Sequence, residues 1–335
     1  MTFVNRAVTV VATLAVATVL PQWTPMASAT TDCDIPASGA IDATDVEGLD
    51  AVECDVIGRQ VDLGDVVLDV PEPGSGVALE ALSDETAEAD ASASIYTAPD
   101  GTISVESAAL DPGPDPRPVG NQTDGCDDDY IGVTKVWKFH GTFDYYVDNE
   151  GQPGGSSYST ADTGAVLEQA GTTWHNEVSP CFSEDHSLAG SLNYAGSTTW
   201  NGDFKIVDGT STCADRDHRS VVDTGNLNKA GTGTYVGLNC IWYNSDDIVI
   251  ESDIRFNTHD YDFTYTPMAA DCDESRDYDV QSVMTHEAGH TYGMKDQVDS
   301  YNFYQTMYHN SDTCENYARN LGRSDVRHLR AQYRE

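Results

Sequence analysis

The sequence predicts a sheet of strands with a few packed helices, in the α/β or α+β class, and three observations lead to this prediction. Apolar residues alternate with polar ones in some segments, they recur at helical spacing in others, and the two kinds of segment are mixed along the chain. The length of 335 residues suggests about two domains. Although the formal net charge is −39, the hydrophobic fraction of 39% is typical of a globular protein.

The regular elements are expected in the part of the chain that follows residue 120. Alternating apolar residues predict strands over residues 143–147, 236–242 and 248–256. Apolar residues at helical spacing predict helices over residues 166–174, 280–284 and 326–333. Thr160 or Asp162 is the expected cap of the first helix, and Ser324 is the expected cap of the last.

The N-terminus has the pattern of a secretory signal peptide. An apolar run from Ala7 to Leu20 follows Arg6, and small residues at Ala27–Ala29 precede the expected cleavage site. The run is about 14 residues long, short of the ~20 needed to span a membrane. We therefore expect residues 1–29 to be removed and the mature protein to be secreted and extracellular. In that oxidising setting the eight cysteines are expected to form disulfide bonds.

Two segments of unlike charge follow the signal peptide. Residues 30–120 carry 21 acidic and two basic side chains, whereas residues 121–335 carry 35 acidic and 14 basic ones. A linker rich in proline and glycine, residues 111–120, lies at this change and predicts a domain boundary. Cys33 and Cys54 precede the linker and six cysteines follow it, so each segment can form its own disulfide bonds.

The acidic balance excludes two classes of partner. A sequence pI near 4.1 implies a surface that repels phosphate, and we expect neither nucleic acid nor an anionic membrane as a partner. Bound calcium is a possible second cofactor, because Asp127–Asp129 and the carboxylates between Asp271 and Asp279 are grouped. Neither group has the register of a calcium loop, and a solvated surface is the favoured interpretation of both.

The residues that carry chemistry lie between 286 and 296. His286 and His290 are spaced i, i+4, so their rings project from one helix face and can bind one zinc ion. Glu287 follows the first ligand and points beside the metal, where a general base belongs. Gly293 can adopt a positive φ, which lets the chain turn back and bring Asp296 to the metal as a third ligand. A fourth position is left for water, as in catalytic zinc sites.

This extended pattern, HExxHxxGxxD, resembles the signature of the metzincin zinc endopeptidases, and it is most similar to that of the secreted snapalysin-like and matrixin-like bacterial members. Thr306-Met307-Tyr308 resembles their Met-turn, in which the methionine packs beneath the zinc. The resemblance implies an α+β catalytic domain over residues 121–335, with a twisted mixed sheet of five strands and about three helices. It also implies that His309, two residues after Met307, is a candidate to stabilise the transition state.

The function expected from this resemblance is that of a secreted, monomeric zinc endopeptidase acting on proteins or peptides. Glu287 would take a proton from a water activated by the Zn2+ and pass it to the leaving amine. The strand around 235–242 is expected to be an edge strand that binds the substrate as an added strand. The alternative is an acidic secreted binding or surface protein with a vestigial metal site, and the intact Glu287 argues against it.

The resemblance further predicts that residues 30–120 are a small acidic propeptide, cut near the linker, so that the protein is made as a zymogen. Matrixins block their zinc with a cysteine in a PRCGVPD motif. The comparable residues here, Pro116-Arg117-Pro118-Val119, lack that cysteine. Cys33 and Cys54 are therefore expected to be bonded to each other.

Overall fold

A computed structural model describes most of the chain beyond residue 32. The described residues are 33–64, 66–84, 90–110, 125–126, 137–182, 189–207, 209–214, 216–227, 235–267, 272–273, 275–298 and 303–333. The predicted signal peptide, the linker at 111–120 and the acidic run Asp127–Asp129 lie outside them. Residues Cys33–Glu335 form one compact unit.

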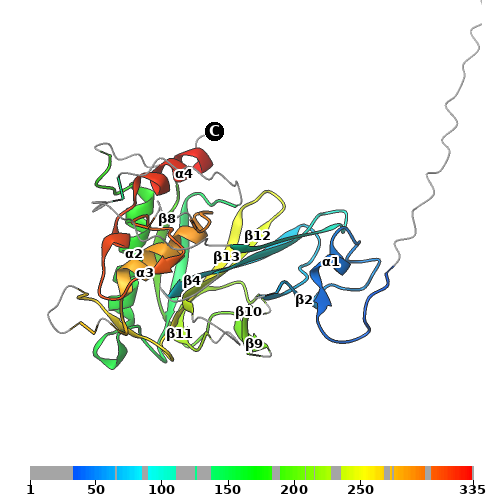
Figure 1. Ribbon diagram of the computed structural model, residues 1–335, viewed down its shortest axis with the longest axis horizontal. Helices are drawn as coiled ribbons and strands as arrows, with labels where there is room; N and C mark the ends of the chain where they lie inside the picture. The colour runs from blue at the N-terminus through cyan, green and yellow to red at the C-terminus, as the bar shows by residue number, and fades with distance from the viewer. Residues whose placement is uncertain are drawn as a thin grey trace, which may run out of the picture. The chain divides into compact units, whose positions relative to one another are not determined.

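The described part of the chain is dominated by one mixed sheet of nine strands (Figure 1). Eight strands follow the order β6-β5-β4-β12-β13-β11-β7-β8, and β16 pairs with the end of β4. The strands are β4 (Ser75–Asp84), β5 (Asp90–Thr97), β6 (Ile103–Leu110), β7 (Thr142–Asp148), β8 (Ser191–Thr198), β11 (Ser220–Gly225), β12 (Tyr235–Asn244), β13 (Val249–Asn257) and β16 (Asn310–Ser311). Strands β8, β7, β11 and β13 are parallel, whereas β12, β4, β5 and β6 pair in antiparallel fashion.

Four α-helices and several short elements complete the described structure. The helices are α1 (Ala43–Val46), α2 (Thr160–His175), α3 (Val280–Thr291) and α4 (Arg323–Tyr333), with 3-10 turns η1 (Gly155–Ser157) and η3 (Tyr317–Arg319). The small sheets are made of β1 (Ile41–Asp42), β2 (Gln60–Asp62) and β3 (Val67–Asp69), of β9 (Phe204–Val207) and β10 (Thr210–Cys213), and of β14 (Asp262–Thr264) and β15 (Asp277–Asp279). Ser159 caps α2 in a capping box with Asp162, and Asp279 caps α3.

The predicted fold class is wrong. Strands account for 37% of the described residues and helices for 20%, so the chain is mostly β instead of an α+β domain with a five-stranded sheet. The expected class fails because of the acidic segment, residues 30–120. It does not stand apart as a small pro-segment before a catalytic domain. Its strands β4, β5 and β6 continue the sheet from β12, where main-chain hydrogen bonds to a neighbouring strand are available.

The expectation that residues 235–242 form an edge strand is also wrong. Strand β12 is hydrogen-bonded to β13 on one side and to β4 on the other. Its pairing with β4 extends from Tyr235 opposite Ser83 to Asn244 opposite Ser75. In Figure 1 β4 runs beside β12 and β13 toward α3. The main-chain groups of β12 that would receive an added strand are therefore already paired.

Two hydrophobic cores lie against the sheet, and β4 contributes to both. One core holds apolar side chains of α2, α3 and α4, together with Met307 from the segment between α3 and α4 and with Ala78 and Leu82 of β4. The other holds β1–β3 and includes Leu79 and Ala81. Because successive side chains of a strand point to opposite faces, the even-numbered residues of β4 face the helices.

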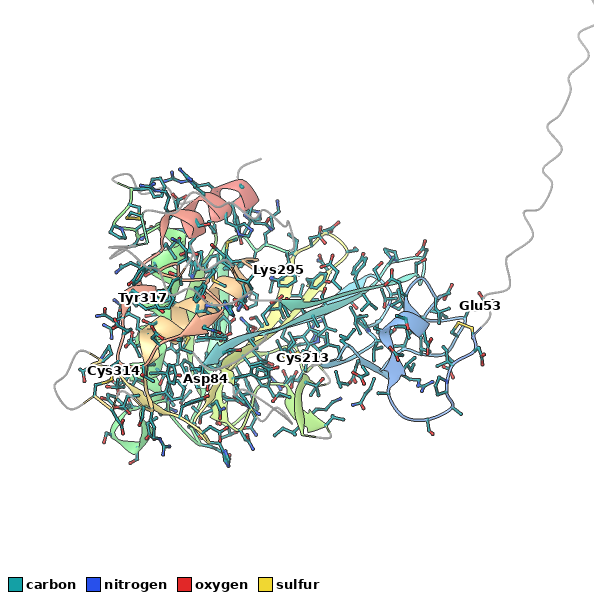
Figure 2. All side chains as sticks on the ribbon, viewed as in Figure 1. Glu53, Asp84, Cys213, Lys295, Cys314 and Tyr317 are labelled. Atoms are coloured by element: carbon teal, nitrogen blue, oxygen red, sulfur yellow. A yellow bond between two sulfur atoms is a disulfide. The ribbon has the colours of Figure 1, made fainter. Side chains whose placement is uncertain are left out.

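All cysteines in the described residues form disulfide bonds, as predicted for an oxidising compartment. The bonds are Cys33–Cys54, Cys126–Cys181, Cys213–Cys240 and Cys272–Cys314 (Cys213 and Cys314 are labelled in Figure 2). The expected Cys33–Cys54 bond is confirmed, and among the described residues no disulfide joins residues 33–110 to the residues after the linker. In the described part of the chain, no helix is both long and apolar enough to cross a membrane.

Candidate metal centre

Helix α3 places the two candidate histidine ligands on adjacent turns inside the molecule. Asp279 begins the helix by accepting a hydrogen bond from Ser282 N, and every residue of α3 is buried. His286 and His290 are 1% and 0% exposed. Their Nε2 atoms lie 3.1 Å apart, as the i, i+4 spacing predicts for two rings on one helix face.

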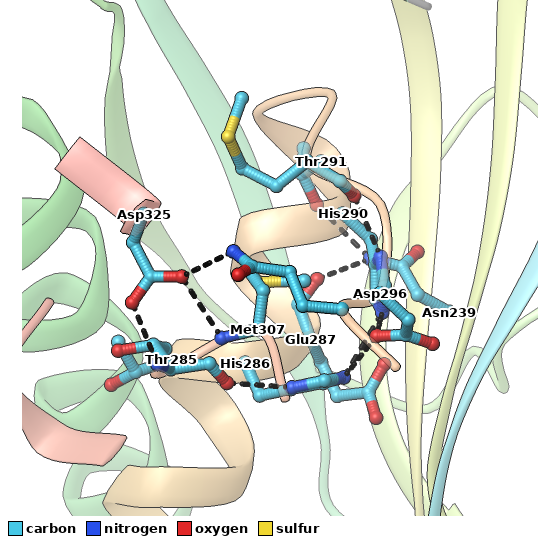
Figure 3. A network of polar contacts seen from close by, with 12 residues as sticks. Asn239, Thr285, His286, Glu287, His290, Thr291, Asp296, Met307 and Asp325 are labelled. Atoms are coloured by element: carbon cyan, nitrogen blue, oxygen red, sulfur yellow. Dashed lines mark hydrogen bonds and ion pairs between the residues drawn. The ribbon is translucent and has the colours of Figure 1, made fainter. Parts of the chain in front are cut away.

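The chain turns back directly after α3, and the turn brings the third candidate ligand to the histidines (Figure 3). Gly293 has a φ of +80°, as predicted, and a Cβ at this position would lie 1.9 Å from Trp137 O. Asp296 Oδ1 then lies 3.2 Å from His286 Nε2 and 3.5 Å from His290 Nε2. A glycine is required here both by the left-handed backbone and by the close approach of another main-chain segment.

Each histidine is oriented by a carbonyl oxygen behind it. His286 Nδ1 lies 2.8 Å from Thr306 O, and His290 Nδ1 lies 2.9 Å from Met294 O. A carbonyl oxygen only accepts, so each Nδ1 carries the proton and donates it. Each Nε2 is left with a lone pair for a metal. Burial and the neighbouring His286 hold the pKa of His290 well below its usual value, which favours the neutral form that metal binding needs.

The donor atoms fit a zinc ion. His286, His290 and Asp296 each offer a ligand atom within 4.8 Å of the others. Zinc–nitrogen bonds of ~2.0–2.1 Å in a tetrahedron separate two ligand atoms by about 3.3 Å. The three observed separations, 3.1, 3.2 and 3.5 Å, lie around that value. Two neutral imidazoles and one carboxylate are also a donor set that zinc accepts.

Glu287 lies beside this group on the side of β12. Its side chain is fully buried, and neither carboxylate oxygen makes a hydrogen bond of normal geometry, although the main chain of Leu82 is near enough to lower its pKa. Burial, with the charges of Asp296 and Glu80, raises that pKa well above its usual value. Gly237 of β12 leaves room for the carboxylate, because a Cβ there would lie 2.4 Å from Glu287 Oε1.

The predicted Met-turn packs beneath α3. Met307 is fully buried, and a Cβ at Gly289 would lie 2.3 Å from Met307 Sδ, so the glycine makes this contact possible. Asp325, in the first turn of α4, accepts hydrogen bonds from Thr306 N at 2.7 Å and Met307 N at 3.2 Å. Nothing in the sequence singles out Asp325, since an acidic residue in a first helical turn normally indicates only favourable helix-dipole charge.

His309 is not one of the residues whose ligand atoms converge. Its side chain is buried next to the Met-turn, and its main chain connects two segments: His309 N donates to Gln297 O, and Ser83 N of β4 donates to His309 O. Its predicted role in stabilising a transition state stays a prediction.

A further carboxylate that the sequence analysis missed faces the same region. Glu80, in the middle of β4, is fully buried, and neither of its carboxylate oxygens has a hydrogen-bond partner. Burial raises its pKa to about 7, while Lys295 lowers it and Asp296 raises it further. Ser92, its neighbour on β5, lowers the pKa but makes no hydrogen bond of normal geometry with it. A single glutamate within an apolar run was the only signal in the sequence.

Calcium was weighed as a second cofactor for two acidic groups, of which Asp127–Asp129 lie outside the described residues. Of the described members of the 271–279 group, Asp277 accepts from Asp273 N, and Asp279 pairs with Arg319 as well as capping α3. A second acidic group, Asp203, Asp217 and Glu251, has ligand atoms within 4.8 Å of one another. In this group Arg216 Nε lies 2.7 Å from Glu251 Oε2, so an arginine side chain already supplies positive charge to the carboxylates.

No family model, curated protein or solved structure matched this chain. Function must therefore be inferred from the residues of the site. The group offers three candidate ligands, His286, His290 and Asp296, whereas a closed structural zinc site has four protein ligands, and the buried carboxylate of Glu287 lies beside them.

Proposed function

We propose that the protein is a secreted zinc-dependent endopeptidase of the metzincin type. The observation that carries the proposal is the convergence of His286, His290 and Asp296 on one point, with the carboxylate of Glu287 next to it. The buried Met307 beneath α3 and the turn at Gly293 support it. Both features lie outside the short HExxH pattern, which a solvated helix could also carry.

The chemistry follows from the positions of the side chains. A zinc ion held by the three ligands would supply a Lewis acid that activates water and polarises a carbonyl group. Glu287 is not one of the three ligands, so its carboxylate is available to take a proton from the attacking water. It then passes this proton to the nitrogen of the scissile peptide bond, which leaves as an amine. The carbonyls of Thr306 and Met294 keep both imidazoles in the tautomer that the reaction requires.

Secretion is part of the proposal. Four disulfide bonds support an oxidising compartment, and the N-terminal pattern of residues 1–29 supports export. The predicted propeptide role of residues 30–120 and the cut near 111–120 stay predictions.

The test is a hydrolysis assay on the protein recovered from an export-competent host. It should cleave casein, a chelator should abolish the cleavage, and added Zn2+ should restore it. Metal analysis should give one zinc per chain, and a His286→Ala/His290→Ala variant should bind none. Cleavage that persists in chelator, or zinc retained by the double variant, would contradict the proposal.

A further inference from the structure

A group of buried polar side chains joins the last turn of α3 to the sheet. It takes one residue from each of three strands, Tyr145 of β7, Asn239 of β12 and Ser252 of β13, and it ends at Thr291, the last residue of α3. All four residues are fully buried. Because a buried polar group is unfavourable unless it is hydrogen-bonded, the partners of these side chains decide what the group does.

The amide of Asn239 has only one possible orientation. Its Nδ2 donates to Glu287 O at 2.6 Å and to Thr291 Oγ1 at 3.1 Å (Figure 3). A main-chain carbonyl only accepts, so the amide nitrogen must face α3 and the amide oxygen must face away from it. Ser252 Oγ donates to that oxygen at 2.7 Å and thereby uses its single proton.

The hydroxyl groups then follow one direction of donation. Ser252 and Thr291 have their hydroxyl oxygens 2.9 Å apart, and Thr291 must be the donor because the proton of Ser252 is already used. Tyr145 Oη lies 2.9 Å from Thr291 Oγ1 and must donate to it for the same reason. Thr291 Oγ1 thus donates once and accepts twice, which is the full capacity of a hydroxyl group. The group has a single arrangement of its protons.

These hydrogen bonds hold the turn of α3 that carries the candidate chemistry. Glu287 O and Thr291 Oγ1 lie one helical turn apart, and Asn239 donates to both. His290, a candidate ligand, lies between them. Strand β12 also contacts the side chain of Glu287, because a Cβ at Gly237, two residues before Asn239 and on the same face, would lie 2.4 Å from Oε1.

Apolar side chains alone would pack α3 against the sheet without fixing its rotation. The hydrophobic effect is non-directional, whereas a hydrogen bond requires a short distance and a narrow range of angles. Rotation of α3 about its axis would move the Glu287 carboxylate and the His290 ring together. Since a displacement of about 1 Å in a catalytic group can lower a rate by about 10²-fold, a fixed rotation matters for this site.

We propose, on the basis of the proposed function, that Asn239 is a positioning residue of the metal centre. It is not a member of the ligand group, and it acts through the main chain of Glu287 and the hydroxyl of Thr291. Ser252 holds its amide in the orientation that α3 requires. Through Asn239, the sheet sets where α3 presents its base and its second histidine.

The test compares the full-length wild type with Asn239→Ala and with a matched control, Asn257→Ala. Asn257 is also fully buried, but its Nδ2 donates to Tyr235 O at 2.7 Å and to Asp260 at 3.0 Å instead of to α3. Urea unfolding should show a loss of stability in both variants. Zinc affinity, measured by competition with a chromophoric chelator, should fall about tenfold or more in Asn239→Ala alone, as for the loss of an outer-shell partner.

Hydrolysis of casein at saturating zinc is the second measurement. In Asn239→Ala kcat should fall about tenfold or more while KM changes little, because the base is displaced and the substrate contacts are not. Ser252→Ala, which leaves β12 unchanged, should shift zinc affinity and kcat in the same direction by a smaller factor. It provides the same comparison if Asn239→Ala does not fold.

Equal zinc affinity and equal kcat in Asn239→Ala and Asn257→Ala would overturn the positioning role, since loss of stability alone would then explain both variants. If the wild type binds no zinc, the proposed function and the role of Asn239 fail together. If the wild type binds zinc without cleaving casein, the proposed function fails alone, and the zinc affinities of the variants still decide the role of Asn239.

Discussion

The side chains of the candidate centre form an anionic group inside the protein. Asp296, Glu287 and Glu80 are carboxylates with fully buried side chains, and the carbonyl partners of the two histidines fix the tautomer that leaves each Nε2 with a lone pair. Such a group is unfavourable without positive charge, since burial disfavours each carboxylate and each disfavours the others. A divalent cation relieves both effects at once. At the scale of single residues, electrostatics thus supports the same conclusion as the ligand geometry.

The role assigned to Glu287 predicts that Glu287→Ala keeps zinc and loses activity. Glu287 is a base and not a ligand, so metal analysis should still give one zinc per chain, while the rate of casein cleavage should fall by a factor of about 10²–10⁴ or more. Gly237 borders the carboxylate, and the smaller alanine creates no clash there. An active variant, or a variant without zinc, contradicts the assignment.

The role assigned to Asp296 predicts different results for two substitutions. Asp296→Ala leaves two protein ligands and should weaken zinc binding severely, whereas Asp296→His supplies a nitrogen at the same position and should keep the metal. Zinc content after dialysis and the chelator concentration needed to remove it are the measurements. Full occupancy in Asp296→Ala would mean that another residue is the third ligand, with His309 the first to examine.

At the scale of elements, the turn after α3 decides whether the third ligand reaches the metal. Gly293→Ala should lower both the free energy of unfolding and the affinity for zinc. A left-handed alanine costs about 1–2 kcal/mol, and the Cβ would in addition meet Trp137 O at 1.9 Å.

Gly48→Ala is the matched control for this turn. Gly48 has a similar φ of +78°, but a Cβ there would meet nothing within 4 Å. Urea unfolding should therefore show a clearly larger loss for Gly293→Ala than for Gly48→Ala, and only the first should affect zinc. Equal losses would mean that the close approach of Trp137 relaxes at little cost.

Strand β4 shows how tertiary context can override local preference. Its central residues Ala78-Leu79-Glu80-Ala81-Leu82 are good helix formers, and the sequence analysis assigned no strand there. In the protein they form a strand because β12 and β5 supply hydrogen-bonding partners on both sides. The same pairing explains why Glu80, apparently a surface residue of an acidic segment, is fully buried.

At the scale of the whole molecule, stability is expected to fall as the pH rises. Burial, together with Asp217 and Glu251, raises the pKa of Asp203 to about 7, and burial also raises the pKa of Asp253 well above its usual value. Between an unfolded pKa of about 3.9 and these folded values, the folded state holds more protons than the unfolded state. The stabilising contribution is therefore complete below about pH 4 and is lost as the pH rises through about 7.

The variant Asp203→Asn should flatten this dependence. Thermal unfolding of chelator-treated protein between pH 4 and pH 8 is the measurement, so that no bound cation masks the effect. Asp34→Asn, at an exposed position, controls for the change in net charge. The same slope in all three proteins would show that the acidic group around Glu251 does not control the pH response.

The connection between the acidic segment and the remainder of the molecule gives a last prediction. No described disulfide joins the two, but β4 is paired with β12 over nearly its whole length. After a specific cut within residues 111–120, the two fragments should elute together in gel filtration at micromolar concentration and separate in urea. Separation in native buffer would mean that the strand pairing is weak.

The sequence by itself determined the local chemistry of the candidate centre. The i, i+4 spacing of His286 and His290 and the glycine at 293 act within one helix and its following turn, so short-range geometry is enough to predict where these side chains point. Only the tertiary structure decided the partners of that centre. Strand pairing brings Glu80 opposite Asn239 from about 200 residues before the histidines, and helix packing brings Asp325 to Thr306 from about 40 residues after them, and no local pattern encodes such contacts. The sheet was mispredicted for the same reason, because the order of its strands depends on which edges meet when the whole chain folds.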